Sequence, residues 1–337
     1  MIKKLSFVLL LVITSYGFSQ QQGVYSSFLL NDNYYNPAIA GSKDVHIVSL
    51  GYRNQWTGFT GAPVNVNANF YGSVKNKAKH GYGISFINEK MGITNKAGIY
   101  LNYAYHIKLG KGVKLGLGVR PGFMQYGVKL YNAQLADQGD ALLTGNVYSA
   151  SAIDVSTGFN LYSPKFFVMG SINHLLGNSI QFTAYNSSLS YHYNFIAGYN
   201  FRFDKKKFAL QPSVMFKYAH PAPVQWTGML KGTYNNNYWI GLIYRSDDAI
   251  GISAGVTIKE RFNVGYGYDY TLAGLRKQQT GSHEIMLSFV ITKKRPSLDE
   301  EDDKLNKSVM DDLQKKNEEK EKLQQETPAA PDKLIEQ

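Results

Sequence analysis

The sequence predicts an all-β fold, a transmembrane antiparallel β-barrel of about 14 strands, and three observations support it. Apolar residues alternate with small or polar residues in many stretches, which is the period of a strand with one apolar face. Aromatic residues share the apolar face and gather near the ends of these stretches, as in the girdles of membrane barrels. Short connections alternate with long ones, which is also typical of such barrels.

The composition agrees with this fold class. The chain has 337 residues, with 25 tyrosines, 18 phenylalanines and 32 glycines, and it has no cysteine for disulfides or thiol chemistry. After the N-terminal apolar run, the sequence contains no stretch of about 18 apolar residues, so it predicts no transmembrane helix there. The formal charge is +11, but the basic residues are scattered rather than gathered in a patch, so we expect no nucleic acid partner.

The first residues predict a secretory signal peptide. A basic MIKK precedes an apolar run too short to span a bilayer comfortably, and the small residues Gly17 and Ser19 precede a cleavage site before Gln20. An uncleaved anchor helix is the alternative. We expect residues 1–19 to be removed and residues 20–43 to form a periplasmic or plug segment ahead of the barrel.

Alternation of period two divides residues 44–292 into strands. In GVKLGLGVR, valine and leucine occupy one face, and glycine, lysine and arginine occupy the other. The second face is mostly glycine, serine and asparagine, unlike the threonine, lysine and glutamate of a solvated sheet. The predicted strands are 44–54, 63–73, 80–88, 95–109, 112–126, 151–163, 165–173, 188–203, 207–219, 222–234, 236–246, 248–258, 260–270 and 280–292.

The connections predict the orientation of the barrel. The longer ones are 127–150, 174–187 and 271–279, and outer-membrane barrels place long loops outside and short turns in the periplasm. An even number of strands then places both termini in the periplasm. Inward glycines such as Gly116 and Gly118 predict close packing against the inner wall, either by the N-terminal segment or by an inserted loop.

Residues 293–337 predict a charged periplasmic tail that is helical or disordered. From Ser297 onward the tail has 13 acidic and 7 basic residues, opposite in sign to the rest of the chain. Ser297 and Glu300 have the spacing of a helix capping box, and a thin apolar stripe of Leu305, Val309 and Leu313 follows. Two interpretations stay open, a solvated charged helix and a handle for a periplasmic partner.

Three motifs near the N-terminus resemble the front-end signature of the PorP/SprF family. They are NPAIAGS at 36–42, YRNQW at 52–56 and GAP at 61–63, and the resemblance covers about residues 20–292. The family-motif residues are Asn36, Pro37, Gly41, Arg53, Gln55, Trp56 and Pro63. Members of this family are outer-membrane components of the type IX secretion and gliding motility system of Bacteroidota.

The resemblance implies a non-enzymatic barrel that assists secretion or surface anchoring of cargo such as a gliding adhesin. The partners it implies are outer-membrane lipid, the C-terminal domain of a secreted adhesin, and periplasmic components of the type IX system. It carries over no catalytic residue, and we expect no metal or cofactor. A substrate-specific outer-membrane channel is the alternative function.

The motif residues also have a local interpretation. Asn36 and Pro37 predict a turn, and Gly41 predicts a positive φ. Arg53 falls on the inward face, where it would satisfy loop or plug carbonyls or bind a partner's carboxylates. Trp56 falls near the outer rim, where an indole suits the interface between membrane and water.

The long loops supply the candidate partner-binding residues. These loops combine aromatic and amide side chains, which suits a hydrated but specific protein interface. The candidates are Tyr131, Asn132, Asn146, Tyr148, Phe182, Tyr185 and Asn186. An enzyme is not expected, because the 7 histidines are scattered and those near outer loops, His174 and His220, have no acid beside them in the sequence.

Overall fold

The computed structural model describes most of the barrel region and a short part of the tail. The described residues are 23–43, 45–74, 77–110, 112–129, 147–177, 179–181, 186–203, 207–272, 274, 278–291, 307–316 and 318. The expected signal peptide at 1–19 and the capping box of Ser297 and Glu300 lie outside the described residues.

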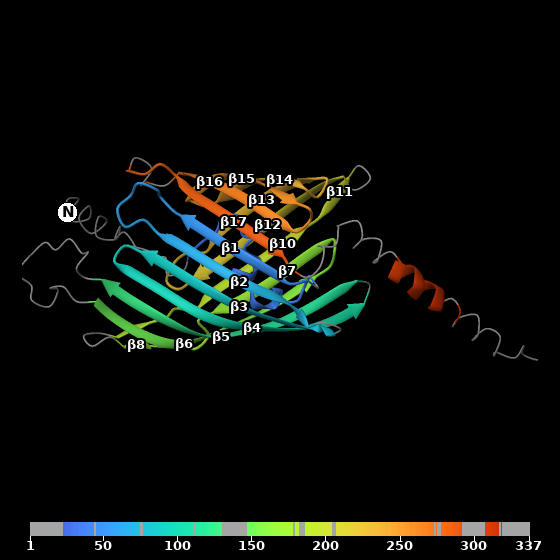
Figure 1. Ribbon diagram of the computed structural model, residues 1–337, viewed down its shortest axis with the longest axis horizontal. Helices are drawn as coiled ribbons and strands as arrows, with labels where there is room; N and C mark the ends of the chain where they lie inside the picture. The colour runs from blue at the N-terminus through green and yellow to red at the C-terminus, as the bar shows by residue number, and fades with distance from the viewer. Residues whose placement is uncertain are drawn as a thin grey trace, which may run out of the picture.

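The chain forms a closed antiparallel β-barrel of 14 strands, as predicted (Figure 1). The strands are β1 (Ile47–Asn54), β2 (Val64–Val74), β3 (Lys77–Met91), β4 (Thr94–Gly110), β5 (Val113–Lys129), β6 (Val147–Tyr162), β7 (Phe166–Asn173), β10 (His192–Tyr199), β11 (Phe201–Phe203), β12 (Phe208–Ala219), β13 (Gln225–Tyr234), β14 (Tyr238–Arg245), β15 (Ala249–Ile258), β16 (Phe262–Thr271) and β17 (Ser282–Val290). Both β10 and β11 pair with β12, so they form one strand that is interrupted at Asn200. Pairing of β1 with β17 closes the barrel.

The two faces of the wall differ as the alternation predicts. Leu117 and Ile252 point outward and are each 48% exposed, whereas the neighbouring inward position Ser253 is 1% exposed. Aromatic side chains join the outward set near the strand ends, where the hydroxyl of Tyr103 bonds His80 Nδ1 at 2.9 Å. A continuous apolar exterior of this kind is stable only against lipid, because exposure to water costs about 25 cal/mol per Å².

The two ends of the barrel carry different connections. At one end, here called the short-turn end, the turns at 111–112, 163–165, 235–237 and 259–261 are brief. The opposite end, here called the long-loop end, carries the connections 55–63, 130–146, 174–191 and 272–281 as well as tight turns. A separate hairpin of β8 (Ser179–Gln181) and β9 (Asn186–Ser188) belongs to the long-loop end.

The inside of the barrel holds a packed core around residues 23–43, here called the N-terminal segment. The segment includes the short helix α2 (Asp32–Tyr35) and the 3-10 helix η1 (Pro37–Ile39), drawn in dark blue within the barrel (Figure 1). Its aromatic and aliphatic side chains pack with inward methionines and isoleucines of the wall. The buried cluster includes Tyr25, Phe28, Tyr34, Tyr35 and Ile39 of the segment and Met169, Ile196, Met215, Met229 and Ile243 of the wall.

The described part of the tail is a single helix over residues 307–316, with nearly every side chain exposed. Val309 and Leu313 of the expected apolar stripe are in this helix, and Leu313 is 52% exposed. Within the residues described, no helix has both the length and the apolar character needed to cross a membrane.

Candidate functional site in the barrel lumen

At the short-turn end the N-terminal segment packs closely against glycines. A Cβ at Gly118 of β5 would lie 2.4 Å from the nitrogen of Ala38. A Cβ at Gly81 of β3 would lie 1.9 Å from the carbonyl oxygen of Ala40, so the backbones approach where only glycine fits. The same carbonyl accepts a hydrogen bond from His106 Nε2 at 2.7 Å. The predicted inward position of Gly118 is confirmed.

Asn36 joins this end of the segment to β6 and β7. Its side-chain oxygen accepts the backbone N–H of the residue two positions later at 2.8 Å, which caps η1. Its Nδ2 donates to the carbonyls of Phe159 at 2.8 Å and Gly170 at 3.2 Å. Pro37 begins η1, and Gly41 has a φ of +79°, in the left-handed region that favours glycine.

Polar side chains of the wall hold the middle of the segment. Asn33 Nδ2 donates to Asn69 Oδ1 at 3.3 Å, and Arg120 Nη1 donates to the carbonyl of Tyr34 at 2.9 Å. The hydroxyl of Ser171 donates to the next carbonyl along the segment at 2.7 Å. The inward polar residues of the strands therefore satisfy backbone groups of the segment that lie away from bulk water.

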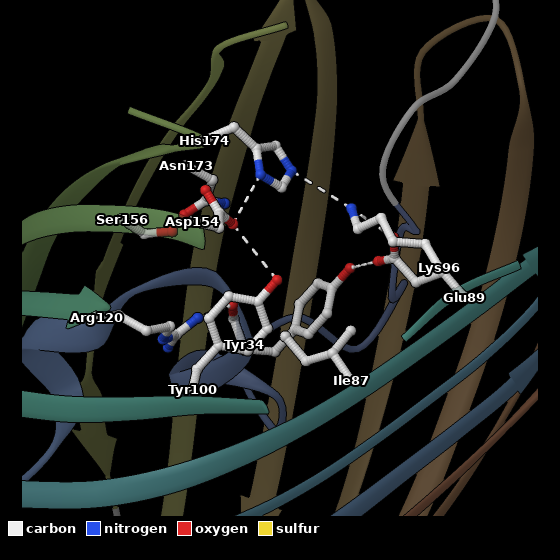
Figure 2. Close-up of a pocket in the computed structure, with 10 residues that line it drawn as sticks. All are labelled: Tyr34, Ile87, Glu89, Lys96, Tyr100, Arg120, Asp154, Ser156, Asn173 and His174. Carbon is white, nitrogen blue, oxygen red and sulfur yellow. Dashed lines mark hydrogen bonds and ion pairs between the residues drawn. The ribbon is translucent and has the colours of Figure 1, made fainter. Parts of the chain in front are cut away.

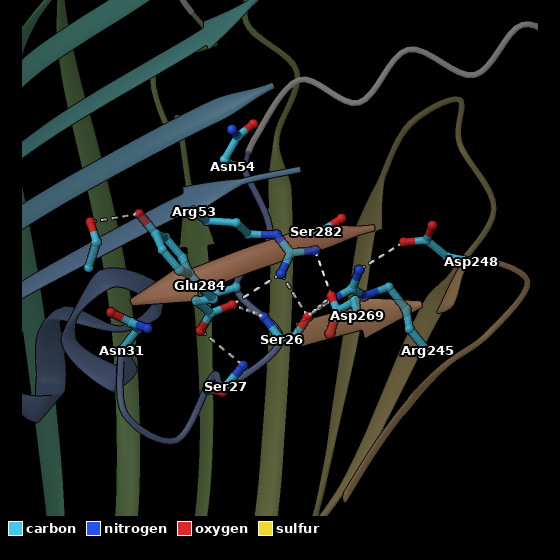
Figure 3. A network of polar contacts seen from close by, with 12 residues as sticks. Ser26, Ser27, Asn31, Arg53, Asn54, Arg245, Asp248, Asp269, Ser282 and Glu284 are labelled. Atoms are coloured by element: carbon cyan, nitrogen blue, oxygen red, sulfur yellow. Dashed lines mark hydrogen bonds and ion pairs between the residues drawn. The ribbon is translucent and has the colours of Figure 1, made fainter. Parts of the chain in front are cut away.

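At the long-loop end the segment meets a buried charge network (Figure 3). Arg53 of β1 lies 2.7 Å from Asp269 Oδ2 of β16 and 3.1 Å from Glu284 Oε2 of β17. Its Nη1 also donates to the hydroxyl of Ser26 at 3.0 Å, and that hydroxyl donates to Asp269. Arg53 is 1% exposed, so loss of its charge would leave two buried carboxylates with fewer cations, a cost of about 3–5 kcal/mol.

The network extends from the segment backbone to β14. The N–H groups of Ser26 and Ser27 donate to the two carboxylate oxygens of Glu284 at 2.8 Å and 3.2 Å. Arg245 pairs with Asp248 at 2.8 Å, lies 3.5 Å from the same Asp269 carboxylate, and donates to the Ser26 hydroxyl. The segment thus bridges the first and last strands of the barrel at their common seam.

A second charged cluster lies at the long-loop end, across the lumen on β3, β4, β6 and the residue after β7 (Figure 2). Lys96 Nζ lies 3.0 Å from Glu89 Oε2 and 3.3 Å from His174 Nε2, and His174 Nδ1 lies 2.8 Å from Asp154 Oδ2. The Nδ1–H therefore donates to Asp154, and Nε2 accepts from Lys96. Burial, and then the charge of Lys96, lower the pKa of His174, which favours this neutral form.

This cluster corrects one expectation from the sequence. His174 was expected to have no acid beside it, but Asp154 bonds its ring. Sequence spacing hid this contact, because Asp154 lies in the middle of β6 and His174 directly follows the neighbouring strand β7. Both ring nitrogens of His174 are occupied by the lysine and the aspartate, so neither is available to activate a nucleophile.

The same cluster lines a cavity of about 20 Å³. This volume holds about one water molecule. One Asp154 carboxylate oxygen and both polar atoms of the Asn173 side chain have no protein partner among the described residues. These groups suit an ordered water between the wall and the segment, and the cavity is too small for an organic substrate.

The family description "Type IX secretion system membrane protein PorP/SprF" matches residues 17–289. The chain belongs to the PorP/SprF family. It is therefore an outer-membrane β-barrel of the type IX secretion system, as the N-terminal motifs indicated. No curated protein matches the sequence of this PorP/SprF chain.

Solved outer-membrane barrels resemble this PorP/SprF barrel only distantly. A Pseudomonas aeruginosa FadL homologue is 10% identical over 75% of this chain and 91% of its own, with a TM-score of 0.44. The CymD monoaromatic hydrocarbon channel is 11% identical over 82% and 96%, with a TM-score of 0.46. The Pseudomonas putida toluene transporter TodX is 7% identical over 79% and 93%, with a TM-score of 0.44.

The PorP/SprF motif residues fall at the two ends of the N-terminal segment. Asn36, Pro37 and Gly41 fix the short-turn end, and Arg53 belongs to the charge network at the long-loop end. Arg53 differs from its expected role, because it contacts two carboxylates and a hydroxyl rather than loop or plug carbonyls. The alternation correctly placed Arg53 on the inward face, but the carboxylates that it contacts belong to strands near the far end of the barrel sequence.

The rest of the PorP/SprF motif builds the β1–β2 connection. The Gln55 N–H donates to the carbonyl of Pro63 at 2.9 Å, which closes this loop. Trp56 has a φ of 54°, and its N–H donates to the hydroxyl of Ser282 at 3.1 Å. The loop therefore docks on the start of β17, beside the charge network.

The candidate partner-binding residues cannot be placed by their side chains. Tyr131, Asn132, Asn146, Phe182 and Tyr185 lie outside the described residues, as do the side chains of Tyr148 in β6 and Asn186 in β9.

The structure adds charged residues that the sequence did not single out. They are Glu89, Lys96, Asp154, Arg245, Asp248 and Glu284. The available signal was a charged residue at an inward position of a strand or directly beside a strand, on a face otherwise built from glycine, serine and asparagine.

Proposed function

We propose that this PorP/SprF protein is a non-enzymatic barrel that assists secretion or surface anchoring of type IX cargo, such as a gliding adhesin, by binding the cargo's C-terminal domain. The observation that carries the proposal is the filled lumen. Residues 23–43 pack against the wall at both ends and through the middle, so the barrel supplies a rigid support for loops rather than a wide pore.

The long-loop end is the proposed cargo face, on the outer side of the membrane. Outer-membrane barrels carry their long loops outside and their short turns in the periplasm. The β1–β2 connection at this end is fixed by hydrogen bonds to β17, and Glu284 and Arg53 brace the strands beneath it. Strand β17 ends at the short-turn end, so the C-terminal tail extends into the periplasm in this orientation.

The predicted outer loops 127–150 and 174–187 supply the contact residues in this proposal. Shortening either loop should leave a folded barrel in the outer membrane but release the adhesin from the cell surface. Folding is checked by the mobility difference between heated and unheated samples on gels, and adhesin by antibody binding to intact cells. A matched control shortens the 272–281 connection, which contains no aromatic residue. Normal adhesin display after both shortenings would contradict the proposal.

Two observations support a role without catalysis and without open diffusion. Both ring nitrogens of His174 are already bonded, and the Figure 2 cavity has room for about one water. A substrate-specific channel is the second candidate, and it would require a continuous path past the N-terminal segment. Steady conductance in planar bilayers separates the channel from the cargo-binding barrel.

A further inference from the structure

We infer that the mature amino terminus lies at the long-loop end of the barrel, the same end as the proposed cargo face. The even strand number places the start of β1 at the short-turn end, which was the reason to expect a periplasmic amino terminus. The N-terminal segment alters that conclusion because it returns through the lumen before β1 begins. The path of the segment through the lumen does not depend on the proposed function. Only the assignment of the long-loop end to the outside of the cell rests on it.

Contacts with strand β3 show the direction in which the N-terminal segment runs through the lumen. At its short-turn end, Gly81 lies against Ala40 and Gly41. Toward its long-loop end, Glu89 accepts a hydrogen bond from the backbone N–H of Gly23 at 3.1 Å. These two β3 positions are eight residues apart, which is about 26 Å along a strand. The segment thus advances through the lumen as the residue number falls.

Contacts with other strands follow the same order. Asn36 bonds the carbonyl of Phe159 in the short-turn half of β6, and the carbonyl of Tyr34 accepts from Arg120 near the middle of β5. Ser26 then bonds Glu284 and Asp269, which lie at the long-loop ends of β17 and β16. No contact in this series reverses the direction.

The residues ahead of Gly23 are too few to return to the short-turn end. Cleavage before Gln20 leaves three residues, which span about 10 Å at most when fully extended. The return path along β3 is about 26 Å. The mature terminus therefore stays near the long-loop end.

The segment is also fixed in this direction. Ser26 and Ser27 donate their N–H groups to Glu284, whose other partner is Arg53. Tyr25 and Phe28 are fully buried beside these polar contacts. Withdrawal of the segment would expose this apolar surface and leave the carboxylates of β16 and β17 with fewer partners in a buried site.

The consequence is that the start of the N-terminal segment and the long loops belong to the same end of the barrel.

Single cysteines test this inference, because the chain has none of its own. Gln21→Cys reports the amino terminus, Thr60→Cys reports the long-loop end, and Lys165→Cys reports the short-turn end. A membrane-impermeant maleimide is applied to intact cells and to permeabilised cells, and the mass of each mature protein verifies cleavage before Gln20. We expect Gln21→Cys to behave like Thr60→Cys, with at least tenfold more label on intact cells than Lys165→Cys.

Each outcome has a separate meaning. Labelling of Gln21→Cys together with Lys165→Cys, but not with Thr60→Cys, would overturn the inference. If Gln21→Cys and Thr60→Cys are both protected while Lys165→Cys is labelled, the path through the lumen stands and the proposed orientation fails. If Gln21→Cys is shielded in both preparations, an epitope inserted between Gln22 and Gly23 replaces the cysteine as the reporter of the amino terminus. Detection of this epitope only after permeabilisation, in a barrel whose Thr60→Cys is labelled on intact cells, would overturn the inference.

Discussion

The two ends of the N-terminal segment are held by different physical means. At the short-turn end, Ala38 and Ala40 fit against Gly118 and Gly81, and the contacts are short and uncharged. At the long-loop end, buried charges around Arg53 bond the segment backbone and side chains. The first end should be sensitive to added atoms, and the second end to the loss of charge. A segment held in both ways is a fixed part of the barrel core.

The largest expected effect is the loss of charge at the long-loop end. Arg53→Ala leaves the carboxylates of Asp269 and Glu284 buried with fewer cations, and it should destabilise the long-loop end by about 3–5 kcal/mol. Amide hydrogen exchange at residues 24–30 should accelerate more than exchange at residues 37–41. Arg53→Lys is the matched control, because it keeps the charge and should cost less. Equal acceleration at both ends would show that the segment responds as one unit.

The next effect is steric and belongs to the short-turn end. Gly118→Ala places a methyl group 2.4 Å from a backbone nitrogen of the segment, and a backbone atom cannot move away as a flexible side chain can. We expect a loss of about 1–3 kcal/mol, with faster exchange at residues 37–41. Gly232→Ala is the control, since its nearest neighbour would lie 3.8 Å away. Unchanged exchange in Gly118→Ala would contradict the close packing at this end, because it would mean that the segment lies further from the wall.

A smaller effect concerns pH and only the long-loop end. Burial and Lys96 lower the pKa of His174, whereas an opened site would restore it to about 6.5. Opening therefore takes up a proton below about pH 6.5, and the closed site should lose up to about 1.4 kcal/mol per pH unit there and nothing above it. Hydrogen exchange at the long-loop end, compared between pH 7.5 and pH 5.5, measures this. His174→Gln should remove the pH dependence; if it does not, another group is responsible.

The smallest effect on the barrel concerns the tail. Truncation after Arg295 removes no strand, so the stability of the barrel should change by less than about 0.5 kcal/mol. If the tail is a periplasmic handle, fewer type IX components should co-purify with the truncated protein. Identical partner sets with and without the tail would reduce it to a solvated extension, and loss of the folded barrel would mean that the tail contributes to the wall.

The strands and their faces were accessible from sequence because period two is a local property. Ser253 and Leu117 could be assigned to opposite faces without knowledge of their neighbours, and the structure confirms both. The interruption at Asn200 was not foreseen, and 188–203 was expected as one strand. Its two parts nevertheless pair with the same strand, so the expected number of spanning strands holds.

The charge pairs could not be predicted from the sequence, because they depend on which strands meet when the barrel closes. Arg53 and Glu284 are 231 residues apart, and they become neighbours only through the pairing of β1 with β17. Alternation identifies the inward face of each strand, but it does not give the height of a residue relative to distant strands. The contact of Asp154 with His174 was missed because alternation does not give the register of even neighbouring strands such as β6 and β7.

The most direct test of the filled lumen is electrical conductance of the purified full-length protein in planar bilayers. With the N-terminal segment packed inside, the protein should show no steady conductance, and deletion of residues 23–41 should produce large, lasting openings if the barrel stays folded by the heat-modifiability assay. Large steady conductance of the intact protein, unchanged by the deletion, would contradict the account and favour the channel.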